Sequence, residues 1–257
     1  MFIKKESLAQ LKINFYIILI IITFKLKYAE APDYINLWVT WNIGQGQWVT
    51  HVLPDTCLHY DMGGEFGSFK KNKKIMIRYC GNKLNKLNLS HWDFDHYFNI
   101  PLFNKVVPKL CWVNIPEFGL TKKSVHNILD LNIPKCNSEI KNIGMWLPSD
   151  ARDTNESSMI FYDENVLITG DSPIQKEKIW VTEIENINLT RVLILGHHGS
   201  RTSTGKDLLG HLPNLKFSIA SARYAKYKHP HIETLIRLAE FNIPVLKTED
   251  WGNIWFE

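Results

Sequence analysis

The stretch "SHWDFDH", residues 90–96, places two aspartates and two histidines within six positions. In an extended segment, side-chain alternation would direct the first histidine and both aspartates to one side and the two aromatic residues toward a core. Carboxylates held together repel one another, and divalent cations remove that cost. Imidazoles among carboxylates also suit such ions. The spacing therefore predicts metal binding rather than a polar surface turn, with His91, Asp93, Asp95 and His96 as ligands.

Three other polar segments follow apolar, strand-like runs. Asp61 follows "TCLHY", "TGD" occupies residues 169–171 after "NVLI", and "GHHGS" occupies residues 196–200 after "RVLIL". Layered folds assemble sites from distant segments at the ends of their strands. We therefore expect these segments to meet the 90–96 motif.

The order of elements favours a mixed α/β (α+β) sandwich. Three strand-like runs between residues 37 and 63 are separated by short turns, which is typical of antiparallel pairing. Later strand-like runs alternate with helical spacing. The last two runs, 245–250 and 253–257, are joined by Trp251-Gly252, and this pattern predicts a closing hairpin.

The N-terminal segment differs from the rest of the chain. A basic start, the apolar run "INFYIILIIITF" at 13–24 and "AEA" at 29–31 are typical of a signal peptide. The run is shorter than the roughly 20 residues of a membrane span, and an uncleaved anchor is the alternative. We expect a signal peptide or N-terminal anchor at 1–31, one domain at 32–257, and an exported protein that is periplasmic, secreted or membrane-anchored.

Export affects how charge and cysteines are interpreted. The net charge of +4 equals that of residues 1–29, which hold five lysines and one glutamate, so global basicity gives no argument for nucleic acid. The cysteines lack CxxC spacing, which argues against a zinc-thiolate site. Cys57, Cys80, Cys111 and Cys136 could form two disulfides or remain buried thiols.

The motif "HWDFDH" resembles the HxHxDH signature of the metallo-β-lactamase superfamily, with Asp93 where the second histidine usually stands. This variant is similar to the C-terminal nuclease-like domain of ComEC-type DNA-uptake proteins. The resemblance covers about residues 36–256 and implies a metallo-β-lactamase αββα four-layer sandwich. It continues through "WNIGQGQW" (41–48), "YDMGG" (60–64), "NESSMIFYDENVLITGD" (155–171), "LGHHGSRTST" (195–204) and "KHPHIETLIRLAEFNIPVLKTEDWGNIWF" (228–256).

The resemblance also implies roles for individual residues. One metal ion would be held by His91 and Asp93, a second by Asp95, His96 and His229, and Asp171 would bridge both. His197, His198 and Asp95 would act in catalysis, with one histidine protonating the leaving oxygen. The reverse assignment, with a histidine of "HHGS" as ligand and His229 in catalysis, stays open. Asp61 and Asn155 would support the ligands from behind, and Ser200, Arg201 and Lys228 would contact the substrate.

The implied activity is that of an exported binuclear hydrolase. Two divalent ions, Mn²⁺ or Zn²⁺, would lower the pKa of a bridging water, and the hydroxide would cleave a phosphodiester, with DNA as the expected substrate. Asp93 in place of a histidine makes the ligand set harder and favours Mn²⁺. The alternatives are hydrolysis of a small phosphoester such as phosphocholine, or of another ester, and a catalytically silent binding module. With at most one apolar span, the chain would form no DNA channel of its own.

Two features depart from the family pattern or add to it. Asn42 and Gln47 replace the aspartates of the family's DVGQGD turn, which puts substrate positioning in question. "SARYAKYKHPH" at 221–231 interleaves tyrosines with cations, a composition that suits single-stranded nucleic acid. The same composition is at least as typical of an ordinary structural loop with packed tyrosines.

Overall fold

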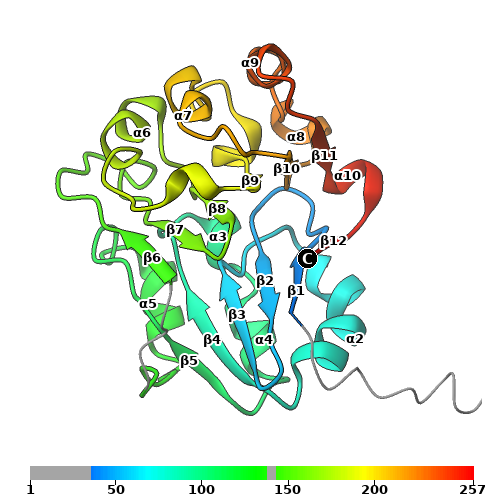
Figure 1. Ribbon diagram of the computed structural model, residues 1–257. Coiled ribbons are helices and arrows are strands. Elements are labelled where there is room, and N and C mark those ends of the chain that lie inside the picture. Colours follow the sequence, from blue (N-terminus) through cyan, green and yellow to red (C-terminus); the bar gives the residue numbers. More distant parts are fainter. Residues whose placement is uncertain (1–35, 138–142) are drawn as a thin grey trace, which may run out of the picture. The chain divides into compact units, whose positions relative to one another are not determined.

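Two six-stranded sheets and their covering helices make up the chain in the computed structural model, which describes residues 36–137 and 143–257 (Figure 1). The signal peptide or anchor expected at 1–31 lies outside the described residues. Within the described ranges, no helix combines the length and the apolar character needed to cross a bilayer.

The first sheet comes mostly from the N-terminal half of the chain. Its strands are β1 (Leu37–Thr40), β2 (Val49–Val52), β3 (Thr56–Tyr60), β4 (Leu84–Asn88), β5 (Leu110–Trp112) and β12 (Ile254–Phe256), in the order β12-β1-β2-β3-β4-β5. The first three strands pair antiparallel, as predicted, and β4 and β5 continue in parallel. In the chain, α2 (Ser68–Cys80) follows β3, α3 (Phe94–Tyr97) and α4 (Ile100–Asn104) follow β4, and α5 (Lys123–Leu129) follows β5.

The second sheet comes from the C-terminal half. Its strands are β6 (Ile143–Trp146), β7 (Ile160–Asp163), β8 (Val166–Ile168), β9 (Val192–Ile194), β10 (Phe217–Ala220) and β11 (Val245–Lys247), in the order β11-β10-β9-β8-β7-β6. The helices are α6 (Ile174–Trp180), α7 (Lys206–Gly210), α8 (Tyr224–Tyr227), α9 (Ile232–Glu240) and α10 (Thr248–Trp251), with 3₁₀ turns η1 (Ile187–Leu189) and η2 (Gly196–Gly199).

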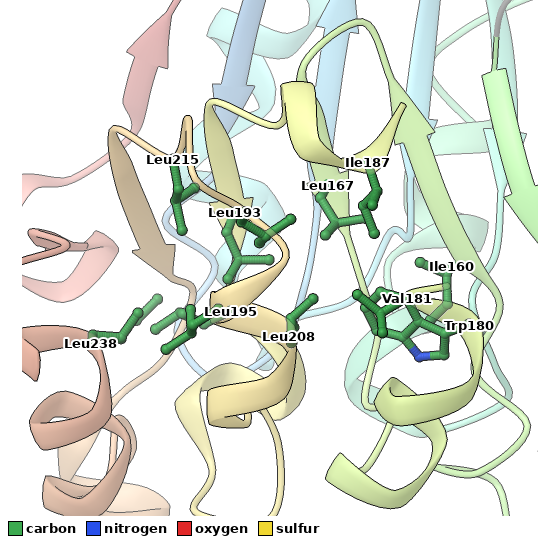
Figure 2. Close-up of a cluster of buried hydrophobic side chains, with 13 residues drawn as sticks. Ile160, Leu167, Trp180, Val181, Ile187, Leu193, Leu195, Leu208, Leu215 and Leu238 are labelled. Carbon is green, nitrogen blue, oxygen red and sulfur yellow. The ribbon is translucent and has the colours of Figure 1, made fainter. Parts of the chain in front are cut away.

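Side-chain alternation along the second sheet separates two cores. In β8, Val166 and Ile168 join a cluster that contains Tyr60 of the first sheet. Leu167, between them, joins a second cluster with Trp180 of α6. Figure 2 shows this second cluster between the sheet and helices α6, α7 and α9. One core therefore lies between the sheets and the other under the helices.

The outer face of the first sheet is covered by aromatic side chains from α2 and α4. The Trp48 ring, just before β2, lies 6.2 Å from the ring of Phe69 and 5.3 Å from that of Phe103. The fold is thus helix, sheet, sheet, helix, and the predicted α/β four-layer sandwich is confirmed.

The predicted closing hairpin is wrong. Strand β11 pairs in parallel with β10 in the second sheet, whereas β12 pairs antiparallel with β1 in the first. Helix α10 lies between them, and Gly252 adopts a φ of 75° as the chain crosses. A glycine turn between two strand-like runs does not distinguish a hairpin from a crossing between stacked sheets.

Both pairs of cysteines form disulfides. Cys57 in β3 is joined to Cys80 at the end of α2, and Cys111 in β5 is joined to Cys136. The sequence was also compatible with buried free thiols, but none of the four cysteines is free. The bridges fasten α2 and the segment after α5 to the first sheet.

Candidate metal centre

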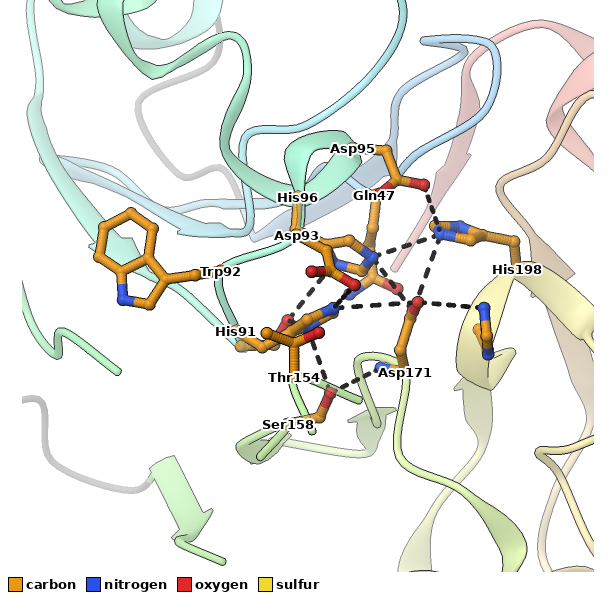
Figure 3. A network of polar contacts seen from close by, with 12 residues as sticks. Gln47, His91, Trp92, Asp93, Asp95, His96, Thr154, Ser158, Asp171 and His198 are labelled. Atoms are coloured by element: carbon orange, nitrogen blue, oxygen red, sulfur yellow. Dashed lines mark hydrogen bonds and ion pairs between the residues drawn. The ribbon is translucent and has the colours of Figure 1, made fainter. Parts of the chain in front are cut away.

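Segments that follow strands of both sheets converge on one polar cluster. Asp61 follows β3, residues 90–96 follow β4, Asp171 follows β8, and the "GHHGS" segment follows β9. Figure 3 shows side chains of the 90–96 motif and His198 of the "GHHGS" segment meeting around Asp171. The strand ends therefore bring together the segments that the sequence placed there.

Five side chains supply two groups of possible ligand atoms. His91, His96 and Asp171 form one group and Asp95, His96 and His198 the other, with the ligand atoms of each group within 4.8 Å of one another. Asp171 Oδ1 lies 3.1 Å from His96 Nε2 and 3.7 Å from His198 Nε2. Its Oδ2 lies 3.9 Å from His91 Nε2. The Asp171 carboxylate thus faces both groups.

The hydrogen bonds of two histidines direct lone pairs into the cluster. His96 Nδ1 lies 2.8 Å from Asp61 Oδ2, and His198 Nδ1 lies 3.0 Å from the backbone carbonyl of Ser221. Because both partners are acceptors, each Nδ1 carries the proton and each Nε2 presents a lone pair. The two Nε2 atoms are 3.3 Å apart, an unfavourable approach unless a cation or proton lies beside them.

A buried nitrogen without a partner supports the same conclusion. His91 Nε2 is buried and has no hydrogen-bond partner, while its Nδ1 lies 3.0 Å from the hydroxyl of Ser90 and 3.2 Å from that of Ser158. Leaving a buried polar atom unpaired costs about 1–3 kcal/mol. A divalent cation would compensate, so these donors fit a metal ion in number, burial and chemistry.

Asp61 fixes the base of the cluster. Its carboxylate accepts hydrogen bonds from the Ser90 backbone N–H at 2.7 Å, the Gln47 amide at 2.8 Å and His96 Nδ1 at 2.8 Å. Gln47, which departs from the family pattern, therefore donates to Asp61. An aspartate in the same orientation would present a second carboxylate to Asp61 instead of a donor.

Charge governs the protonation of the cluster. Burial disfavours the charged form of His96, but the carboxylates of Asp171 and Asp61 outweigh it and raise the pKa of His96 well above its usual value. Burial likewise opposes ionisation of Asp171 and Asp95. Two nearby histidines, His96 and His198, nevertheless lower the pKa of the Asp171 carboxyl. His198 contributes most to lowering the pKa of the Asp95 carboxyl. A metal ion would therefore compete with protons at this site.

The 90–96 motif is not extended throughout, and the predicted alternation fails at Phe94. Asp93 has extended backbone, and helix α3 begins at the next residue. Trp92 is fully buried and donates from Nε1 to the carbonyl of Pro116, whereas Phe94 is 55% exposed. The helical turn brings Asp95 and His96 into the cluster from adjacent positions, which an alternating strand would not do.

Backbone conformation aims His198 inward. His197, His198 and Gly199 have φ values of 50°, 58° and 87°, a left-handed run that is uncommon for residues other than glycine. His198 is 1% exposed and its Nε2 lies 3.2 Å from Asp95 Oδ2. The side chain of His197 is 27% exposed, with its Nε2 3.5 Å from Asp171 Oδ2.

His229 lies beside the ligand groups rather than within them. Its ring centroid is 5.6 Å from that of His197 and 6.3 Å from that of His198. Burial, reinforced by those two histidines, lowers the pKa of His229 to about 4. The geometry favours the assignment left open above, with His198 of "HHGS" as the ligand and His229 near the reacting groups.

The remaining predicted residues lie at varied positions. Asp93 Oδ2 is 3.6 Å from His91 Nε2. Its Oδ1 is 3.1 Å from Lys122 Nζ, an ion pair that the sequence did not predict. Asn155 contributes only its backbone carbonyl, to Ser158 N. Ser158, the last residue of the N-x-x-S motif, contacts His91 instead. Ser200 is buried after the histidine pair, and Arg201 and Lys228 are exposed.

No family model matches the chain. Among curated proteins it is similar to Recombination protein 2 of Haemophilus influenzae, at 27% identity over 98% of this chain and 32% of that protein. It is also similar to ComE operon protein 3 of Bacillus subtilis, at 32% identity over 73% of this chain and 27% of that protein. A third similar protein is Competence protein ComA of Neisseria gonorrhoeae, at 27% identity over 84% of this chain and 31% of that protein. The chain spans about a third of the length of these relatives or less.

Solved structures agree at the level of the fold. The metallo-β-lactamase fold protein YhfI from Bacillus subtilis matches with a TM-score of 0.54 and 14% identity, over 86% of this chain and 99% of that chain. A diphosphatase from the PhnP family matches with a TM-score of 0.52 and 10% identity, over 86% of this chain and 97% of that chain. At such identities the likeness concerns the fold alone.

Proposed function

We propose a function from two premises: the chain has the metallo-β-lactamase fold, and its homologues are competence proteins. Fold and homologues together support a metal-dependent hydrolase. The finer proposal is that the chain cleaves phosphodiester bonds, with DNA as the substrate. The observation that carries it is the pair of ligand groups that share His96 and face one carboxylate, Asp171.

His91 and Asp171 would hold one divalent ion and Asp95 and His198 a second, and the single Nε2 lone pair of His96, which belongs to both groups, would serve one of the two. When bound, such ions act as Lewis acids toward a phosphoryl oxygen and lower the pKa of water. The hard oxygen donors support Mn²⁺, and the imidazoles also accept Zn²⁺. Asp61 would orient His96 through its hydrogen bond to Nδ1.

His197 and His229 would act on the leaving group and the scissile phosphate. His197 is partly exposed and borders Asp171, and His229 lies next to it. One would protonate the leaving oxygen as a general acid, and the other would contact a phosphate oxygen.

Export is proposed as well. Two disulfides in a small domain are typical of oxidising compartments and support a periplasmic or secreted location. N-terminal sequencing of the protein after expression in a secreting host tests it. A start near residue 32 indicates a cleaved signal, and an intact N-terminus in the membrane fraction indicates an anchor.

The nuclease proposal is tested on the full chain with labelled DNA and added Mn²⁺, Zn²⁺ or Mg²⁺. We expect cleavage that requires metal and is lost in Asp171→Asn, whereas Asp150→Asn, at an exposed position, cleaves as the wild type does. Metal binding without cleavage of DNA, but with hydrolysis of phosphocholine, would replace the proposal by the small-ester alternative. Absence of metal binding would favour the silent module.

A further inference from the structure

Helix α8 exposes aromatic rings beside the metal centre. It is four residues long and buries none of them, although two are tyrosines. Tyr224 is 55% exposed and Tyr227 53% exposed. The ordinary packing that the sequence allowed for these tyrosines is therefore absent. Neighbouring exposed aromatic side chains are typical of binding surfaces.

Hydrogen bonds and an ion pair hold this exposed helix in place. Arg223, the residue before it, places Nη1 3.1 Å from Glu65 Oε2. The backbone N–H of Tyr224 donates to Glu249 Oε2 at 2.9 Å. The tyrosines are thus presented from an anchored segment, which lowers the entropic cost of binding a ligand.

The lysines of the same segment accompany the rings. Lys228 Nζ lies 5.0 Å from the centroid of the Tyr224 ring, and Lys226 Nζ lies 5.2 Å from that of Tyr227. Neither lysine forms an ion pair with a carboxylate in the part of the chain that the structure describes. Each ring therefore has a cation beside it whose charge is available to an anionic ligand.

Ring contacts connect α8 to the metal centre. The Tyr227 ring centroid lies 5.9 Å from that of His229, and the His229 ring lies 5.6 Å from that of His197. His197 Nε2 is in turn 3.5 Å from Asp171 Oδ2. A ligand on the tyrosines would therefore extend directly toward the proposed ligand groups.

We propose that Tyr224 and Tyr227, with Lys226 and Lys228, form a site that stacks unpaired nucleobases and holds the phosphates between them next to the metal centre. The inference rests on the proposed function, because it assigns the strand that the phosphodiesterase would cleave. Rings and cations in alternation match the alternation of bases and phosphates in a single strand. In a duplex both faces of each base are already stacked, so a single-stranded segment is the favoured occupant.

Binding tests the inference separately from catalysis. Fluorescence anisotropy of a labelled oligothymidylate, without added metal, gives the Kd for the full chain. Since stacking contributes about 1–3 kcal/mol per base, we expect Tyr224→Ala/Tyr227→Ala to raise this Kd by about tenfold or more. Tyr224→Phe/Tyr227→Phe, which keeps both rings, should bind as the wild type does. Binding of Mn²⁺, measured by calorimetry, should be unchanged in both variants, because neither tyrosine belongs to a ligand group.

The lysines are tested by the salt dependence of the same binding. Lys226→Ala/Lys228→Ala should lower the slope of log Kd against log salt by about 1.4, since each phosphate contact in a single strand contributes about 0.7. Lys73→Ala/Lys74→Ala removes the same charge from an exposed face of α2 and is the matched control.

Wild-type affinity for the oligonucleotide in Tyr224→Ala/Tyr227→Ala, or an equal loss of duplex binding, would overturn the inference. An unchanged slope in the Lys226/Lys228 variant would remove the lysines from it. Oligonucleotide binding without cleavage of DNA would contradict the proposed function instead.

Discussion

At the residue scale, the site depends on how each imidazole is oriented. His96 and His198 both use Nδ1 for a hydrogen bond to an oxygen, which leaves Nε2 for a metal ion. His91 is oriented by two serine hydroxyls. Such supporting contacts are as much a part of a metal site as its ligands. The first two predictions concern them.

Asp61→Asn should weaken metal binding. The Asp61 carboxylate accepts four hydrogen bonds around the cluster, and an amide NH₂ in its place would face donors. Losing a group that orients a ligand typically costs about 10–100-fold in metal affinity, and we expect that loss here. Isothermal titration calorimetry with Mn²⁺ measures it. Asp130→Asn, exposed at the end of α5, is the control. Equal affinity in the two variants would contradict the role of Asp61.

His198→Ala and His229→Ala separate the two assignments of the late histidines. His198 lies within a ligand group, so its loss should remove about one metal ion per chain. His229 lies outside both groups, so its variant should keep both ions and lose turnover by about 100-fold or more, as for a lost hydrogen-bond donor to the reacting phosphate. Metal analysis beside a hydrolysis rate distinguishes the outcomes. Loss of an ion from His229→Ala alone would restore the original assignment.

At the scale of elements, two loops fix the start of α3. The backbone carbonyl of Asp95 accepts from the N–H groups of Gln47 and Gly64, both at 3.0 Å. Gly63 packs against the same carbonyl so closely that an added Cβ would lie 1.5 Å from it. The glycines of the "GQG" and "MGG" turns therefore allow the loops to approach the backbone of a candidate ligand.

Gly63→Ala should displace Asp95 and destabilise the fold. Overpacking of this kind costs about 1–3 kcal/mol, and here the clash involves backbone that cannot move aside easily. We expect a lower Tm together with weaker metal binding. Gly210→Ala is the matched control, because an added Cβ meets no atom within 4 Å at the end of α7. A Gly63→Ala protein with wild-type Tm and metal affinity would be inconsistent with this contact.

A buried carboxyl in α6 makes stability depend on pH. Glu177 accepts the backbone N–H groups of Thr204 and Gly205 after the histidine pair, and burial raises the pKa of its carboxyl to about 7. Because the usual value is near 4.5, the folded chain binds more protons than the unfolded chain between about pH 4.5 and 7. This contribution to stability is present at low pH and is lost as pH rises through that window.

Urea unfolding of the wild type and Glu177→Gln at several pH values measures this dependence. The variant does not titrate at this position, so the wild type should lose about 3 kcal/mol relative to it across the window. The difference between the two proteins removes the contributions of all other groups. A difference that stays constant with pH would show that Glu177 is ionised throughout.

At the scale of the whole molecule, sequence patterns predicted most of the fold and the segments that form the site. Period-two runs located most of the strands, and polar residues after them located the cluster. The closing hairpin failed because partner choice between two stacked sheets depends on tertiary packing. The sequence could not choose between the two assignments of His198 and His229, since the left-handed turn that directs His198 inward has no clear signal in "GHHGS". Ser158 stood inside a quoted motif, but its contact with His91 depends on how β4 and β7 approach each other.

The central claim is that the two ligand groups bind a pair of divalent ions that make the chain a phosphodiesterase. The most direct measurement removes metal from the full chain with a chelator, then titrates Mn²⁺ while following hydrolysis of bis(p-nitrophenyl) phosphate. The account predicts that the stripped protein is inactive and that the rate rises until two ions are bound per chain, then stays level. Undiminished activity in the stripped protein, or no hydrolysis with both ions bound, would contradict it.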